Sequence, residues 1–72
     1  MPPRRLRLRE VEHRLRAAGY ELVRQTGSHR VWRRDSAEGR RSAVVPNEPV
    51  IAVGTLAHIL RQIGMAWEEF EA

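Results

Sequence analysis

The stretch that decides the fold is residues 20–34, which read YELVRQTGSHRVWRR. Tyr20–Gln25 reads as a β-strand in which Tyr20 and Leu22 face one way and Glu21 and Val23 the other, and His29–Arg34 reads as a second strand. Between them, Thr26-Gly27-Ser28 has the composition of a turn. Consecutive strands joined by so short a turn must be antiparallel. The sequence therefore predicts a hairpin with His29 on the first residue of its second strand.

A third strand is predicted after this hairpin. Asp35–Gly39 has turn composition and Arg41–Val45 reads as a strand. Pro46 should end that strand, because proline cannot donate a hydrogen bond to a central ladder. The stretch Asn47–Val53 is a connection to which the sequence assigns no shape.

Helices are predicted on both sides of the strands. Apolar side chains at helical spacing indicate an amphipathic helix from about Arg7 to Ala18, with Gly19 at its left-handed C-terminal cap. A second helix should begin at Gly54-Thr55, with Thr55 as N-cap, and end at Gly64. Its apolar stripe comprises Leu56, Ile59, Leu60 and Ile63. A last short helical turn is indicated by Met65, Trp67 and Phe70.

This order of elements predicts an α+β two-layer sandwich, α-β-β-β-α, with a three-stranded antiparallel sheet. Two helices would cover one face of the sheet and leave the other partly open. Seventy-two residues make one domain, 1–72, of which 1–6 are expected to form a flexible basic N-terminus. No apolar run has the length of a signal peptide or a membrane span, so we expect a cytoplasmic protein.

The chain is strongly basic. It has thirteen arginines, no lysine, a formal net charge of +4 and a sequence pI of about 11.3. Such a surface favours polyanions, and arginine adds bidentate recognition of phosphate. Alternatively, the arginines only keep a small domain soluble. The absence of cysteine excludes disulfides, thiolate metal sites and cysteine nucleophiles.

Strand alternation places His29, Val31 and Arg33 on one face and Arg30, Trp32 and Arg34 on the other. Trp32 is the better core residue and should lie under the helices, with Arg30 and Arg34 emerging at the sheet edge. His29 and Arg33 would then share the open face, where one phosphate could reach both. The opposite orientation would expose Trp32 as a base-stacking platform.

Cleavage of RNA without a metal needs a group that transfers protons and cations that stabilise the transition state. His29 is the candidate for proton transfer, as base or acid. The candidate phosphate contacts are Arg24, Gly27, Ser28, Arg30 and Arg33. Gly27-Ser28 could equally be only a turn. His13 and His58 are expected to be solvated on the polar sides of helices, and three scattered histidines lack the spacing of metal ligands.

A set of short motifs is spread in order along the chain. It comprises Gly19-Tyr20, Arg24-Gln25-Thr26-Gly27-Ser28-His29, Trp32, Val44-Val45-Pro46, Gly54-Thr55-Leu56, Ile59-Leu60 and Glu68-Glu69-Phe70. With it the chain resembles the HicA (YcfA-like) toxins, messenger-RNA interferases of bacterial and archaeal toxin–antitoxin pairs, over about Arg7 to Phe70. The resemblance departs at Asn47-Glu48, where many relatives carry a histidine, and at Ala66, where many have a serine or threonine cap.

The resemblance implies a fold related to the double-stranded-RNA-binding domain and RNA cleavage without a cofactor. It also implies that His29 is catalytic and that a HicB antitoxin neutralises the protein. The expected partners are mRNA and this antitoxin, and no membrane. The chain would be monomeric when free and hetero-oligomeric with the antitoxin. Two other hypotheses remain at this point: a non-catalytic RNA-binding module, and an interaction protein whose basic face docks an acidic partner.

Overall fold

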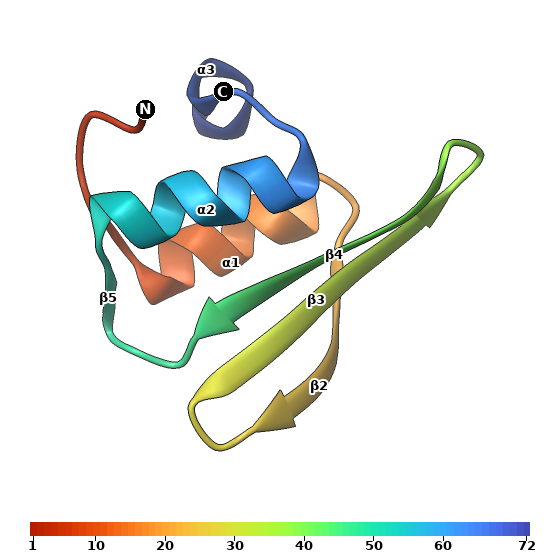
Figure 1. The fold of residues 1–72 in the computed structure, drawn as a ribbon, viewed down its shortest axis with the longest axis horizontal. Helices are drawn as coiled ribbons and strands as arrows, with labels where there is room; N and C mark the ends of the chain where they lie inside the picture. Colours follow the sequence, from red (N-terminus) through yellow and green to blue (C-terminus); the bar gives the residue numbers. More distant parts are fainter.

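The polypeptide folds into two layers, a three-stranded antiparallel sheet and a layer of helices on one of its faces (Figure 1). The computed structural model describes residues 1–72. In chain order the elements are β1 (Leu6–Arg7), α1 (Leu8–Ala17), β2 (Glu21–Thr26), β3 (His29–Ser36), β4 (Gly39–Pro46), β5 (Val50–Ile51), α2 (Val53–Ile63) and α3 (Trp67–Glu71). The predicted α+β sandwich is confirmed, and the molecule is flat, with extents of 31 × 30 × 17 Å.

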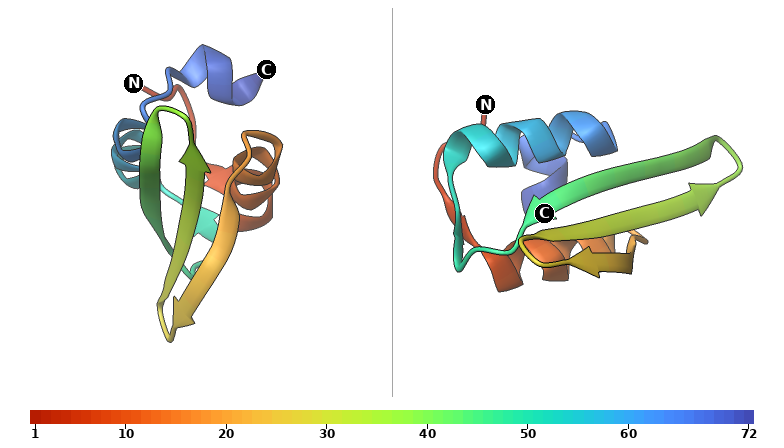
Figure 2. Two further views of the ribbon diagram at one scale, coloured as in Figure 1. Left: turned by 90° about the vertical axis from the view of Figure 1, so that its right-hand side faces the viewer. Right: turned by 60° about the horizontal axis from the view of Figure 1, so that its bottom comes forward.

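The main sheet has the order β2-β3-β4, with β3 in the centre. His29 pairs with Thr26 on β2 and with Pro46 on β4, and the pairing of β3 with β4 continues without a shift to Ser36 and Gly39. A bulge interrupts β2 between Leu22 and Arg24. The β3–β4 hairpin projects well beyond β2 and the helices (Figures 1 and 2).

The core lies between the sheet and the helices. Trp32 is fully buried, and its neighbours across the sheet are Leu22 and the equally buried Ala43. The small Ala43 side chain leaves room for the indole under the helices. The prediction that Trp32 faces the helices is therefore confirmed, and a Trp32 stacking platform on the open face is excluded. The helices contribute Val11 and Leu15 of α1, Leu56, Ile59, Leu60 and Ile63 of α2, and Trp67 and Phe70 of α3 to this core.

The helix boundaries agree with the sequence except at the start of α2. Gly19, after α1, has φ +91°, and Gly64, after α2, is in the left-handed region with φ +67°. Thr55 is not the N-cap, which corrects the prediction. Helix α2 begins at Val53, and its N-cap Ala52 offers no side-chain hydrogen bond. The chain enters this helix directly from β5, and no side chain caps the first turn.

The unassigned stretch before α2 contains a short strand. Val50 and Ile51 form β5, which pairs antiparallel with Leu6 and Arg7 of β1. Leu6 and Ile51 are both 1% exposed. The predicted flexible N-terminus therefore does not extend to Leu6. This two-stranded ribbon ties the start of α1 to the start of α2.

Candidate active site on the open face of the sheet

The turn that carries the site is a two-residue hairpin turn between Thr26 and His29. Gly27 has φ +51° and Ser28 has a negative φ, the combination of a type II′ turn, which requires glycine at this first position. Asn47, just after β4, supports the turn from the other side. The backbone N–H of Asn47 donates to the Ser28 carbonyl at 2.7 Å, and the side-chain Nδ2 of Asn47 lies 3.5 Å from the Gly27 carbonyl oxygen.

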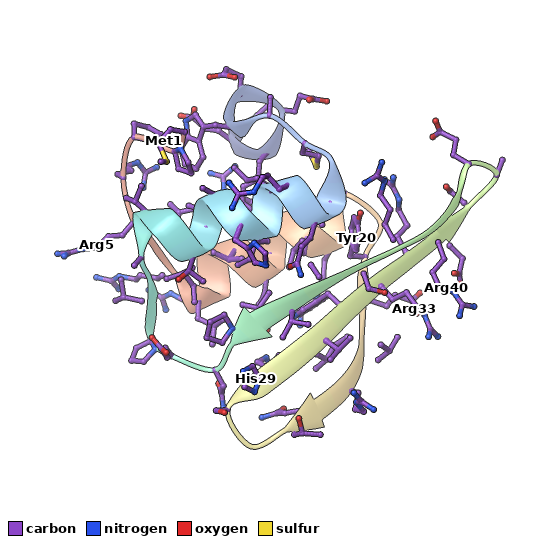
Figure 3. The ribbon with its side chains drawn as sticks, in the orientation of Figure 1. Met1, Arg5, Tyr20, His29, Arg33 and Arg40 are labelled. Atoms are coloured by element: carbon purple, nitrogen blue, oxygen red, sulfur yellow. The ribbon has the colours of Figure 1, made fainter.

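The turn delivers His29 to solvent at the first residue of β3, where the side chain is exposed (Figure 3). Its Nδ1 lies 3.2 Å from the Ser28 hydroxyl oxygen. Nε2 has no hydrogen-bond partner in the protein. The hydroxyl thus contacts one ring nitrogen, and the other makes no hydrogen bond within the protein.

The open face is defined by the register of the three strands. Directly opposed residues share a face, so His29 lies with Thr26, Arg24, Val31 and Val44. Arg24 is opposite Val31 and therefore diagonal to His29, which places their Cα atoms about 7–8 Å apart. Arg24 makes no ion pair and no side-chain hydrogen bond within the protein.

Arg33 shares the open face with His29, as alternation predicts. Four residues along a strand separate the two Cα atoms by about 13 Å. The expectation that one phosphate reaches both side chains stays a prediction.

Arg30 points the other way, toward α1. Its Nε donates to the buried carboxylate of Glu12, and its Nη1 donates to Gln25 Oε1 at 2.6 Å. Glu12 also accepts a hydrogen bond from Trp32 Nε1 at 3.1 Å. The guanidinium is thus held beneath the sheet, on the face opposite to His29. Arg34, also on this face, donates to the Ala18 carbonyl at 3.0 Å.

Sequence reasoning missed the roles of Glu12 and Asn47. Glu12 is only 7% exposed and fixes two side chains of β3 to α1. Glu12 lies four residues after Leu8 and one after Val11, inside the apolar stripe of the helix, and this position could have indicated that it is buried. Asn47 appeared only as a departure from the resembled family, and its contacts with the turn depend on the register of β3 with β4. His13 and His58 are exposed on α1 and α2, as expected.

The fold and the site define a class: small basic α+β proteins with an exposed histidine and unpaired arginine on the open face of an antiparallel sheet. Within it, residues 8–65 match the family model described as the HicA toxin of bacterial toxin–antitoxin systems. The match spans most of the chain and includes His29, so the chain belongs to the HicA toxin family. A search of curated proteins finds no match to it. None of its helices has the length and apolar character needed to cross a membrane.

Proposed function

We propose that this HicA-family toxin is a metal-independent endoribonuclease that cleaves messenger RNA, with His29 as its proton-transfer residue. The observation that carries the proposal is the position of the His29 ring, which is exposed on the open face of the sheet with Nε2 free. Histidine titrates near neutral pH and can therefore both accept and donate protons. The other two histidines lie on helices, away from this face.

The chemistry uses the 2′-hydroxyl of the RNA as nucleophile. Its oxygen attacks the adjacent phosphorus, the bond from phosphorus to the 5′-oxygen breaks, and the fragments carry a 2′,3′-cyclic phosphate and a 5′-hydroxyl. His29 transfers a proton at one of these two oxygens, a contribution typically worth about 10²–10⁴-fold in rate. Arg24 stabilises the additional negative charge on the phosphorus oxygens.

The turn itself provides further room for the phosphate. A side chain at Gly27 would meet no atom within 4 Å, so the backbone here is open to a close approach by the RNA. We assign the Gly27 amide and the Ser28 hydroxyl as further contacts to this phosphate, and Arg33 as a contact to a neighbouring phosphate. The proposal assigns Arg30 to support of β3 through Glu12, since that ion pair occupies its guanidinium.

The family assignment also supports an antitoxin as the second partner. We propose that a HicB-type protein binds the toxin in the cytoplasm, forms a hetero-oligomer with it and prevents cleavage, so that translation stops only when the antitoxin is lost. The net charge of +4 suits an acidic partner surface as well as RNA.

The test compares the wild-type chain with His29→Ala, and uses His58→Ala as the matched control for loss of an exposed histidine. Regulated expression in a host without antitoxin should arrest growth and fragment mRNA for the wild type and His58→Ala only. With purified protein and EDTA present, His29→Ala should cleave at least about 100-fold more slowly. Fragments that end in a 2′,3′-cyclic phosphate would confirm attack by the 2′-oxygen.

Two results would contradict the proposal. Equal cleavage by His29→Ala and the wild type would remove His29 from the reaction. Tight RNA binding without cleavage by either chain, and normal growth with both, would instead define a non-catalytic RNA-binding module.

A further inference from the structure

Most arginines of the chain are engaged within the protein. Five make hydrogen bonds, and Arg4 and Arg16 lie over the rings of Trp67 and Trp32. The remaining six make no ion pair, hydrogen bond or ring contact and are Arg5, Arg7, Arg9, Arg24, Arg33 and Arg61. Arg24 and Arg33 belong to the site described above. Arg7 and Arg9 form a second group of free cations.

This second group lies at the start of α1. Arg7 pairs with Val50 across the β1–β5 ribbon, and the Leu8 amide donates to the Pro49 carbonyl at 3.0 Å. Because Leu6 is buried, alternation turns the Arg7 side chain outward, and both Arg7 and Arg9 are exposed. A hollow of about 300 Å³ lies between them and Pro49, and the carboxylate-bearing Glu12 contributes to its wall.

A three-residue loop joins this group to the His29 site. At one end, Asn47 is hydrogen-bonded to the Ser28 carbonyl, and at the other, Pro49 accepts from Leu8. The loop itself spans at most about 7 Å. Figure 2 shows it running from the end of β4, beside the β2–β3 turn, to β5 beside the start of α1. The His29 site and the Arg7–Arg9 group therefore lie at the two ends of one short loop.

We infer that Arg7 and Arg9 bind the phosphates of single-stranded RNA that leaves the His29 site past the Asn47–Pro49 loop. The inference rests on the proposed function, since it takes RNA as the occupant. Exposed guanidinium groups without an acidic partner suit phosphate, which they bind in bidentate geometry. Glu48 is the one carboxylate on the loop and is exposed, so it repels the same phosphates and lowers their affinity.

The experiment measures RNA binding in the His29→Ala chain, so that cleavage does not interfere. A labelled dodecamer of single-stranded RNA and a dinucleotide are titrated at several salt concentrations. Arg7→Gln/Arg9→Gln should weaken binding of the dodecamer several-fold and leave the dinucleotide unchanged. The slope of log affinity against log salt should become shallower by about 1.4, the value for two phosphate contacts on a single strand.

Matched variants make the result specific. Arg61→Gln removes an equally free and exposed arginine on α2 and should change neither affinity nor slope. Glu48→Gln should strengthen binding of the dodecamer. Both Arg7 and Arg9 are exposed, and thermal unfolding will verify that the double variant retains its fold.

If Arg7→Gln/Arg9→Gln bound the dodecamer with the same affinity and the same salt dependence as the chain with both arginines, the inference would be overturned. The surface would then be a candidate site for a protein partner. Absence of dodecamer binding by the His29→Ala chain itself would also overturn it. Loss of binding in the double variant, together with no cleavage by the chain that retains His29, would instead sustain the inference and refute the proposed nuclease.

Discussion

The Asp35 carboxylate lies directly opposite Arg40 across β3 and β4, at the far end of the open face from His29 (Figure 3). Arg40 Nε donates to its Oδ1 at 2.7 Å. This hydrogen bond is the main cause of a lowered Asp35 pKa. Desolvation acts in the opposite direction, and the charges of Arg40 and Arg33 lower the pKa further. The pair bridges the two strands of the projecting hairpin and is itself well exposed to solvent.

We predict that carboxyl NMR titration will find the pKa of Asp35 below its ordinary value, and that Arg40→Gln will raise it. Arg33→Gln should raise it less, because Arg33 acts only through its charge. Because the pKa of Asp35 is lower in the folded than in the unfolded protein, ionised Asp35 stabilises the fold at pH values above its unfolded-state pKa. This stabilisation is lost as the pH falls through the folded-state pKa. Solvent screening keeps it small. An unchanged Asp35 pKa in Arg40→Gln would refute this account.

Glu12 shows how a single buried carboxylate connects the two layers. It accepts hydrogen bonds from Arg30 and Trp32 of β3 while standing on α1. Both partners lie on the sheet face opposite to His29, so Glu12 fixes the orientation of the strand that carries the candidate site. Removing one partner of such a buried pair leaves an uncompensated charge, which is strongly destabilising.

At the scale of elements, the end of α2 depends on one glycine. Gly64 has φ +67°, and a Cβ there would lie 2.8 Å from Arg41 Nη1 and 2.9 Å from its Cζ. Arg41 Nη1 in turn lies 3.4 Å from the Gln62 carbonyl oxygen, at the last turn of the helix. The positive φ favours a residue without a side chain, and an added Cβ would also have to displace the flexible end of the exposed Arg41 side chain.

We predict that Gly64→Ala will destabilise the fold by about 1–2 kcal/mol from backbone strain, with an added cost from displacing Arg41. The matched control is Gly54→Ala, in the first turn of the same helix, where φ is not positive and no atom lies within 4 Å of the added Cβ. That variant should be as stable as the wild type or more stable by up to about 1 kcal/mol. Urea unfolding measures both, and equal effects would contradict the argument.

The sequence predicts the features that depend on residues close together in the chain, and it misses those that depend on contacts between distant segments. The turn at Gly27-Ser28, the helix end at Gly64 and the burial of Trp32 follow from short patterns, and the structure has them as expected. The β1–β5 ribbon was missed, because two-residue strands carry no periodicity and their pairing is between distant segments. The direction of Arg30 followed from alternation, but its partner Glu12 required knowledge of how α1 crosses the sheet.

At the scale of the whole molecule, arginine side chains join separate elements at helix ends. Arg34 of β3 donates to the carbonyl of Ala18 after α1, and Arg14 of α1 donates to the Phe70 carbonyl at the end of α3. Cations are favourable at the C-terminal ends of helices, where carbonyl groups lack partners. Part of the basic composition is therefore structural, and not all thirteen arginines are free to contact RNA directly.

The whole fold also depends on α3, which packs beside the chain termini and far from His29 (Figures 1 and 3). Phe70 of α3 is 2% exposed within the common core. We predict that Phe70→Ala will cost about 3–5 kcal/mol, because it leaves a cavity in that core. A domain of this size has roughly 4–11 kcal/mol in total. Thermal unfolding should therefore show a much lower Tm and a substantial unfolded population at growth temperature.

The loss of RNA cleavage in Phe70→Ala should depend on temperature, whereas the loss in His29→Ala should not. Phe70→Ala should be inactive in RNA cleavage and harmless to cells when warm, but should recover cleavage at low temperature, where the folded population is restored. His29→Ala should be inactive at every temperature, with an unchanged Tm, because an exposed side chain contributes little to stability. If Phe70→Ala were fully folded when cold and still inactive, α3 would have to contribute to RNA binding or cleavage directly, and the assignment of the site to the open face of the sheet would be incomplete.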